Sequence, residues 1–435
     1  MSPEIQRSQA EIPDHTWNEW SNALVTERQE QFVNDLAEAV SLASINPARV
    51  ERLDDQVGEA RFQHFFQKLC RAKGLPATLQ ESHLEARPNV EVALPGNLSC
   101  RSLLLNGHCD VVAADESNWN HAPFEACVAD GYVRGRGAAD AKGSLLAMLQ
   151  AVWIARELAG DALGPITLTS VVDEEASGGG TEAWLRDQER LGKPLPDAAI
   201  IGEPTGLQPS TATRGARSFQ LAVRGLGAHA GEAYRGVNAV NLAMRFVEAL
   251  EALHRDLACR ADTHLWPELD TPYVFNLGRI GGGSSFASVA ADCEIEGVVG
   301  WVPPDTLASM SARVERVVAE VTQADPWLHK HPPEWRWSWL AFEASQTPTD
   351  HPLVHLLGEE SRRYGYRGEP RGLLAGTDMR LLRSFDIPTV NFGPGDMSQG
   401  HAANEQLEIS QYLDAIRILA NVILRWCLAK KGGAA

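Results

Sequence analysis

The hydrophobic positions of the N-terminal half of the chain alternate between helix-length and strand-length patterns. Apolar residues recur with helical spacing over residues 25–42, 60–72 and 144–158. Short apolar runs of strand length lie at 90–94, 103–106, 166–172 and 198–201. Alternating helices and buried strands are typical of an α/β sheet with helices on both faces. We therefore predict a mixed-sheet α/β domain.

The pattern changes near Ser218 and returns after Gln346. Between them we expect, in order, a strand, a helix, two strands, a helix and a strand, at residues 219–223, 238–257, 273–277, 289–299, 307–321 and 335–340. That order is the split βαβ pattern of a small ferredoxin-like α+β domain. The α/β character then resumes with a helix, a strand and a helix, at 352–364, 388–392 and 410–427. We predict a discontinuous main domain, 1–215 and 343–435, with residues 216–342 inserted into it.

Composition excludes several classes of partner. The chain has 435 residues, 44% of them hydrophobic, which is enough for two cores. Its 39 Lys and Arg against 57 Asp and Glu give a formal charge of −18, which excludes nucleic acid and anionic membrane surfaces as partners. The amino terminus lacks the pattern of a signal peptide, and no window approaches the roughly 20 apolar residues that span a bilayer. Seven scattered cysteines without a C-x-x-C pair indicate reduced thiols, so we expect a cytoplasmic protein.

Chemically useful side chains follow the predicted strands. The run at 103–106 leads into Gly107-His108-Cys109-Asp110, and in open α/β sheets ligands bind at such carboxyl ends of strands. His108 and Asp110 are two residues apart in an extended segment and therefore point to the same face. His108 would then bind a metal ion while Asp110 fixes the ring tautomer. The alternative is a strand-end histidine beside a turn aspartate.

Asp140 lies in the glycine-rich segment RGRGAADAKG, directly before a predicted helix. A carboxylate there could bridge two cations about 3.5–4 Å apart with its two oxygens. Its alternative role is that of a helix cap. The segment has neither of the glycine spacings that cradle phosphates, so nucleotide binding is not expected.

Glu174 and Glu175 are adjacent carboxylates at the end of the run at 166–172. They repel each other unless cations, protons or hydrogen bonds intervene. If they are functional, one ligates a metal ion and the other, facing the opposite way, takes a proton from the attacking water, whose pKa a zinc ion can lower to about 7. The alternative is a solvated acidic turn. Glu203 follows the run at 198–201 in the same way.

Taken together, these motifs resemble the M20 metallopeptidase family, and within it the acetylornithine deacetylase and succinyl-diaminopimelate desuccinylase branch. The resemblance covers nearly the whole chain, through the ordered segments GHCDVV, GRGAADAKG, VVDEEASGG, IGEPTG, RGLGAHAG and GPGDMSQGHAANE. It implies two divalent metal ions, zinc in the first place with cobalt or manganese as alternatives. The implied ligands are His108, Asp140 and Glu203 for one ion, and Asp140, Glu175 and His401 for the other.

The same resemblance assigns the remaining roles. Glu174 would be the general base and acid, and Asp110 the supporting carboxylate behind His108. His229, in the segment AHAG, would reach across a homodimer to stabilise the oxyanion. The discontinuous domain would be the catalytic metal-binding domain, and the inserted one a lid and dimerisation domain.

The chain departs from the family where substrate is expected to bind. Relatives often carry Asn-Val-Val-Pro where this chain has Ser288-Val289-Ala290-Ala291, and Trp301 aligns with an arginine that grips a carboxylate in some relatives. Arg380 is the remaining residue able to grip an α-carboxylate bidentately. Gly376 and Thr377 would add polar contacts, and an exposed arginine at a helix start is the alternative for Arg380. Tryptophans of the inserted domain would accommodate a large acyl group or, as the simpler use, fill the core.

The predicted function is metal-dependent hydrolysis of an amide bond in a small N-acyl-amino acid. One alternative is a dipeptidase or carboxypeptidase of the same family, acting on a short peptide with the same residues. Another is a catalytically silent binding protein on the same fold, which would have lost ligand residues.

Overall fold

The computed structural model describes residues 13–49, 58–82 and 84–432. The chain forms two compact units. Unit 1 comprises Met1–Thr211, Thr347–Pro370 and Thr377–Ala435, and unit 2 comprises Ala212–Gln346 and Arg371–Gly376.

Unit 1 is built on a mixed sheet in the order β1-β2-β6-β3-β7-β15-β8. The central strand β3 is parallel to both of its neighbours, β6 and β7, and β15 is parallel to β7. The strands β1, β2 and β8 pair antiparallel with their neighbours. The strands are β1 (Ala77–Gln80), β2 (Asn89–Leu94), β3 (Leu103–His108), β6 (Ile166–Val171), β7 (Ala198–Ile201), β8 (Ser210–Thr213) and β15 (Thr389–Asn391). The predicted mixed α/β sheet is confirmed.

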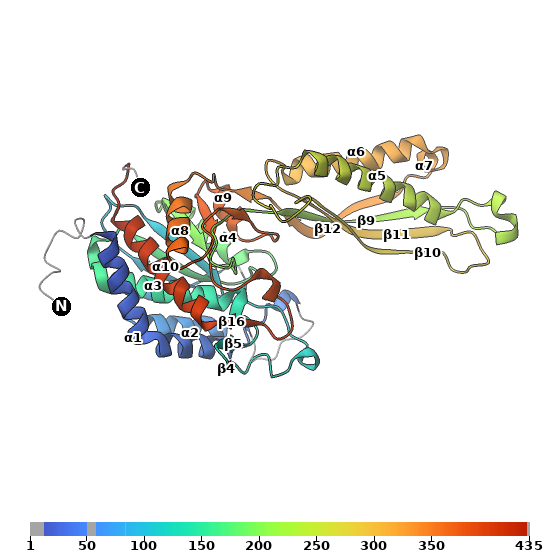
Figure 1. Cartoon of the computed structure of the whole chain (residues 1–435). Coiled ribbons are helices and arrows are strands. Elements are labelled where there is room, and N and C mark those ends of the chain that lie inside the picture. The colour runs from blue at the N-terminus through green and yellow to red at the C-terminus, as the bar shows by residue number, and fades with distance from the viewer. Residues whose placement is uncertain (1–12, 50–57, 83, 433–435) are drawn as a thin grey trace, which may run out of the picture. The chain divides into compact units, whose positions relative to one another are not determined.

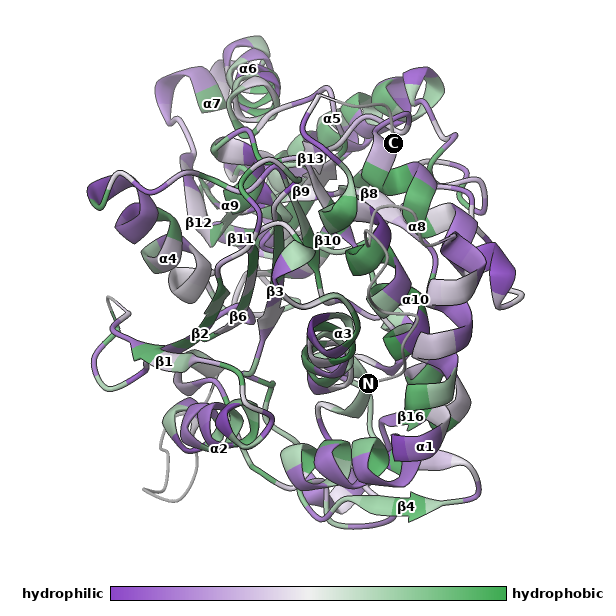
Figure 2. Cartoon of the chain, turned by 90° about the vertical axis from the view of Figure 1, so that its left-hand side faces the viewer, coloured by the Kyte–Doolittle hydropathy of each residue, from purple (hydrophilic) through white to green (hydrophobic). Residues whose placement is uncertain are grey.

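Helices cover both faces of this sheet because the central strands are apolar on both sides (Figure 2). One face packs against a large core supplied by α1, α2, α3, α8 and α10, of which α1, α3 and α10 lie side by side (Figure 1). The other face packs against α4 and α9. These helices are α1 (Asp14–Val40), α2 (Glu59–Ala72), α3 (Gly143–Ala159), α4 (Gly179–Arg190), α8 (Pro352–Arg363), α9 (Met379–Ser384) and α10 (Ile409–Leu428). A small separate sheet joins β4 (Cys127–Ala129), β5 (Tyr132–Arg134) and β16 (Gln406–Glu408).

Three helices of unit 1 differ from the sequence prediction, among them the short helix α9, which was not predicted. The helix expected over 25–42 begins earlier, at Asp14. The apolar pattern did not predict its first turns because a polar residue occupies one of their core positions. There Ser21 is buried and donates a hydrogen bond to Asn421 Oδ1 at 2.8 Å, which interrupts the apolar pattern. Helix α4 was not predicted, since it starts with Gly179 and Gly180, which favour loops.

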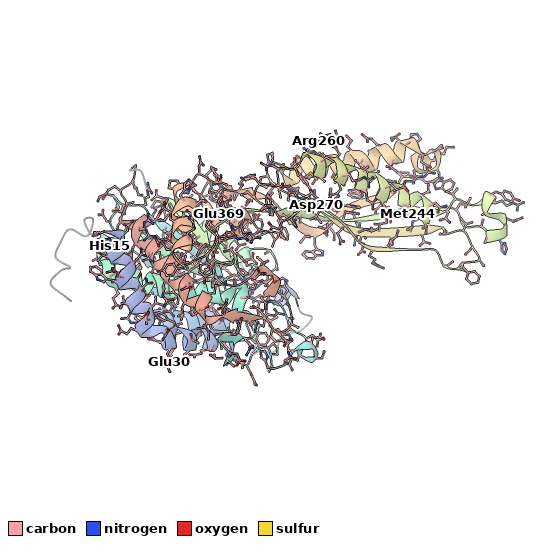
Figure 3. The ribbon with its side chains drawn as sticks, in the orientation of Figure 1. His15, Glu30, Met244, Arg260, Asp270 and Glu369 are labelled. Atoms are coloured by element: carbon pink, nitrogen blue, oxygen red, sulfur yellow. The ribbon has the colours of Figure 1, made fainter. Side chains whose placement is uncertain are left out.

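Unit 2 has a four-stranded antiparallel sheet in the order β10-β11-β9-β12. Helices α5 and α6 lie on one face of it, and their apolar sides form one core with the sheet (Figure 1). Leu242, Phe246 and Leu250 of α5 are buried there, whereas Met244 and Arg260 of the same helix are exposed (Figure 3). The elements are β9 (Gly215–Arg224), α5 (Ala239–Arg260), β10 (Val274–Gly282), β11 (Asp292–Trp301), α6 (Leu307–Ala324), α7 (Pro326–Lys330) and β12 (Glu334–Phe342), with short strands β13 (Ser345–Gln346) and β14 (Arg371–Gly372).

The tryptophans of unit 2 serve mainly as core residues. Trp301 and Trp266 are buried, and Trp335 and Trp337 pack against the core from its edge. Only Trp339, among the tryptophans predicted for the inserted domain, is largely exposed, at 72%. All seven cysteines are free thiols. No helix among the described residues combines the length and apolar character that crossing a membrane requires.

Candidate metal centre

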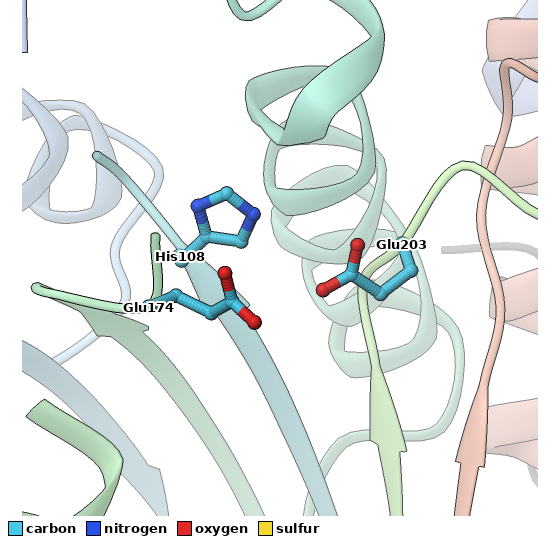
Figure 4. A group of neighbouring side chains, drawn as sticks. All are labelled: His108, Glu174 and Glu203. Atoms are coloured by element: carbon cyan, nitrogen blue, oxygen red, sulfur yellow. The ribbon is translucent and has the colours of Figure 1, made fainter. Parts of the chain in front are cut away.

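The acidic and histidine motifs meet at one edge of the sheet in unit 1. His108 is the last residue of β3, and Glu174 and Glu203 follow β6 and β7, the two strands that flank β3 in parallel. Because parallel strands end at the same edge, their terminal side chains converge. Figure 4 shows the carboxylates of Glu174 and Glu203 facing each other beside the imidazole of His108.

The first group of ligand atoms consists of His108, Glu174 and Glu203. One ligand atom from each lies within 4.8 Å of the others. His108 Nε2 and Glu203 Oε1 are buried, and neither has a hydrogen-bond partner in the described part of the chain. Orphaned polar atoms are costly inside a protein, so a cation between these side chains would satisfy both.

The second group consists of Asp140, Glu175 and His401, also within 4.8 Å of one another. His401 Nε2 lies 2.9 Å from Glu175 Oε2 and 3.7 Å from Asp140 Oδ2. The other oxygen of Asp140, Oδ1, lies 3.4 Å from His108 Nε2 in the first group. The Asp140 carboxylate therefore stands between the groups, one oxygen toward each. The cap of helix α3 is Lys142, so Asp140 does not serve as that cap.

Asp110 contacts more of the centre than sequence reasoning assigned to it. His108 Nδ1 lies 3.0 Å from the Asp110 carbonyl oxygen, which leaves Nε2 facing the ligand groups. The Asp110 carboxylate also accepts hydrogen bonds from the backbone N–H groups of Glu174, at 3.2 Å, and Glu175, at 3.0 Å. Asp110 thus orients the histidine and both glutamates.

Sequence reasoning missed the residues that support Asp110. Asn46 Nδ2 donates to Asp110 Oδ2 at 2.7 Å and to Asp173 Oδ1 at 3.3 Å. Arg87 Nη2 donates to the same Asp173 oxygen at 2.7 Å and to Glu59 Oε1 at 2.9 Å. These residues come from distant parts of the chain and carry no local motif, so only the fold reveals them.

A second supporting chain runs through Asp378, which sequence reasoning also missed. Asn106 Nδ2 donates to Thr181 Oγ1 at 3.1 Å, and that hydroxyl donates to Asp378 Oδ2 at 2.6 Å. Burial raises the pKa of Asp378, and its charge in turn raises the pKa values of Glu174 and Glu203. The negative charge of Asp378 therefore opposes ionisation of both glutamates.

The predicted substrate-binding residues have mostly internal contacts. Arg380 Nη2 donates to the carbonyl oxygen of Ser177 at 2.5 Å, and Nη1 donates to that of Thr377 at 3.2 Å. The Thr377 hydroxyl is buried and donates to Asn391 Oδ1 at 2.8 Å. Gly376 belongs to unit 2, where a side chain at its position would come within 3.2 Å of the Phe342 ring. A substrate carboxylate would have to compete with these contacts of Arg380.

His229 belongs to unit 2 and is exposed. Its Nδ1 accepts a hydrogen bond from the Gly231 N–H at 3.1 Å, which leaves Nε2 available to donate. Its backbone forms an isolated β-bridge with Ser288, so residues 288–291 belong to this loop pair and strand β11 begins only at Asp292. The departure from the family pattern thus lies directly beside His229.

The protonation of the centre differs from that of ordinary side chains. Burial, followed by the charge of the facing carboxylate, raises the pKa of Glu174 well above its usual value, and burial likewise raises that of Glu203. Burial opposes charge on His108, but the neighbouring carboxylates of Asp110 and Asp140 raise its pKa well above the usual value. The hydrogen bond with Glu175 raises the pKa of His401. Without cations the centre therefore holds extra protons, and divalent cations can take their place.

We predict that the metal-free protein loses stability as pH rises from about 5 to 8. Glu174, Glu203, His108 and His401 have folded pKa values above their unfolded ones, so the folded state binds more protons and unfolding becomes easier as they titrate. The lowered pKa values of Asp110 and Asp140 act in the opposite direction, but only below about pH 4. Two further groups oppose the trend: burial lowers the pKa of Lys142 to about 7, which acts above that pH, and lowers the pKa of His351, which acts just below pH 6.5. The four raised groups outnumber these two. Thermal unfolding of chelator-treated protein should show a midpoint several degrees lower at pH 8 than at pH 6. An equal midpoint at both pH values would contradict it, and added Zn²⁺ should remove the difference.

Comparison with known proteins relates the chain to one protein family and to several of its enzymes. The chain matches the model of peptidase family M20/M25/M40 over residues 104–425. The N-formyl-4-amino-5-aminomethyl-2-methylpyrimidine deformylase of Halalkalibacterium halodurans is 32% identical, covering 79% of this chain and 84% of its own. The acetylornithine deacetylase of Yersinia pseudotuberculosis is 29% identical, covering 75% of this chain and 80% of its own.

Solved structures share the fold. A tripeptidase from Staphylococcus aureus superposes with a TM-score of 0.70 at 18% identity, covering 92% of this chain and 98% of its own. Human carnosine dipeptidase 1 superposes with a TM-score of 0.66 at 17% identity, covering 94% of this chain and 99% of its own.

Proposed function

Because the chain belongs to peptidase family M20/M25/M40, we propose that it is a metal-dependent amidohydrolase that removes an acyl group from the nitrogen of a small molecule. The observation that carries this proposal is the pair of ligand groups with the Asp140 carboxylate between them. The residues fit two divalent cations, since each group offers one imidazole and at least one carboxylate. We infer that Asp140 is shared, with His108 and Glu203 completing one site, and Glu175 and His401 the other.

The chemistry follows from what each group can hold. Bound divalent cations would polarise the scissile carbonyl and make water a better nucleophile. Glu174 lies in the first group, and its raised pKa suits a carboxyl that takes a proton from water and then delivers it to the leaving nitrogen. The Asp110 carboxylate keeps Glu174 in place by accepting a hydrogen bond from the backbone N–H of Glu174. We infer that His229 donates to the oxyanion from the second subunit of a homodimer.

We further infer that residues 216–342 form a ferredoxin-like domain that acts as a lid and in dimerisation. Their compact core and the exposure of His229 support this view. The free cysteines support a cytoplasmic location.

The relatives favour removal of a small acyl group from nitrogen over cleavage of a peptide bond. Both named relatives remove a small acyl group, formyl or acetyl, from an amine. The peptidases share the fold at lower identity, so a dipeptidase or carboxypeptidase is the second candidate function. The two functions use the same metal centre and differ only in the substrate.

A substrate panel on metal-loaded protein tests the proposal. We expect hydrolysis of N-formyl, N-acetyl or N-succinyl compounds to exceed that of dipeptides by at least about tenfold in kcat/KM, which corresponds to about 1.4 kcal/mol. The panel varies the acyl group separately from the amine, with amino acids and an aminomethylpyrimidine as amines. A preference for dipeptides would favour the second function, and no hydrolysis of any amide would contradict both. Zinc, cobalt and manganese are compared on the best substrate.

A further inference from the structure

Glu405 is a buried carboxylate that none of the roles above uses. It is fully buried, directly before strand β16, and four groups donate hydrogen bonds to it. Its Oε1 accepts from the N–H groups of Ala139, at 2.8 Å, and Asp140, at 2.9 Å. Its Oε2 accepts from the Gly137 N–H at 3.0 Å and from Arg136 Nη1 at 2.7 Å. One side chain therefore fixes the backbone of the turn that presents Asp140.

Arg136 extends this contact to His401. Its guanidinium donates through Nη1 to Glu405 and through Nη2 to the carbonyl oxygen of His401, at 3.3 Å. His401 has a left-handed backbone with φ of 60°, which is unfavourable for a residue other than glycine, so it needs support from its surroundings. The Glu405–Arg136 pair thus holds Asp140 and the backbone of His401 at once.

These contacts act mainly on one ligand group, because His401 belongs to that group alone, whereas Asp140 also directs Oδ1 toward His108 of the other group. Asp140 and His401 belong to the second group, together with Glu175. Glu174 is held by Asp110, on the other side of the centre. The first group therefore depends on the Glu405–Arg136 pair only through Asp140, and the second group depends on it through both Asp140 and His401.

The charge of Glu405 matters as well as its geometry. Arg136 is buried with only 4% of its side chain exposed, and its charge opposes protonation of His401. The same charge would repel a cation held by His401. Glu405 neutralises it at a distance of 2.7 Å.

We propose that Glu405 is a positioning residue that sets the affinity of the second metal ion more strongly than that of the first, by fixing Asp140 and His401 and neutralising Arg136. This inference rests on the proposed function, since it requires a two-metal centre. It concerns the relative strength of the two sites and is measured on metal binding itself.

Glu405→Gln tests the inference with little change in volume. The amide has only one oxygen that can accept. Its NH₂ group would face N–H groups that now donate hydrogen bonds to the carboxylate. We expect the second metal ion to bind about 10- to 100-fold more weakly, and the first ion, which depends on this support only through Asp140, to lose clearly less affinity. Titration of Zn²⁺ into metal-free protein, with atomic emission for stoichiometry and the cobalt absorption spectrum for the ligand environment, measures both sites.

Glu360→Gln is the matched control, because Glu360 is another fully buried glutamate that accepts from an arginine, Arg425 Nη1, at 2.7 Å. It should keep both metal affinities. If Glu405→Gln does not fold, Arg136→Lys retains the charge but cannot span Glu405 and His401, and should weaken the same ion to a smaller degree. Wild-type affinity for both ions, or equal loss of both, would overturn the inference. Failure of the proposed function looks different: a wild-type protein with two metal ions that hydrolyses no amide.

Discussion

Glu174→Gln is expected to lower kcat by about 10²- to 10⁴-fold while leaving metal content near two ions per chain. The carboxyl of Glu174 lies in the first ligand group, and burial raises its pKa well above the usual value. The amide has the same shape but cannot take or deliver a proton. The loss should therefore appear in kcat, with KM nearly unchanged.

The measurement combines steady-state kinetics on the best substrate of the panel with metal analysis of the same preparation. Glu182→Gln is a suitable control, because Glu182 is a half-exposed residue on helix α4 that pairs with Arg186 on the surface. Retained activity in Glu174→Gln would remove its role as proton carrier. Loss of metal as the main defect would instead make Glu174 a ligand, which its place among His108 and Glu203 would permit.

The sequence was most informative where candidate ligand residues directly follow a predicted strand. The strands that lead to His108, Glu174 and Glu203 were predicted as short apolar runs, and parallel strands bring their ends together by geometry alone. His401 and Asp140 were located by motif and by the family resemblance, since no local pattern distinguishes a ligand from a loop residue. The structure adds the distances that place them in one group.

What the sequence could not predict are the contacts that hold these side chains. Asn46, Arg87 and Glu405 act on Asp110, Asp173 and Asp140 respectively, across long separations in the chain. Each is a polar residue in an unremarkable setting, and its role depends on tertiary packing. The same holds for helix α1, whose buried Ser21 is a core residue only because Asn421 faces it. Patterns of apolar residues cannot report a polar group that is satisfied by a distant partner.

His229→Ala is expected to lower kcat by about 10²- to 10³-fold without changing metal content, because in the role proposed for it the imidazole donates to the developing oxyanion. His229 lies in unit 2, its Nδ1 accepts from Gly231, and Nε2 remains available to donate. His229→Gln is the companion variant, since its amide keeps one donor and should recover part of the lost activity. Wild-type kcat in His229→Ala would rule out the oxyanion role.

Mixing this variant with Glu174→Gln tests where the histidine acts. If His229 serves the active site of its partner, a heterodimer of the two variants contains one site with an intact Glu174 and an intact histidine. Random pairing in a two-fold dimer then gives about a quarter of wild-type activity, far above either variant alone. Co-expression with two different affinity tags isolates the heterodimer and gives its activity directly. Activity no higher than that of the parents would mean that His229 acts within its own chain, or that no dimer forms, and sedimentation of the same sample separates these two outcomes.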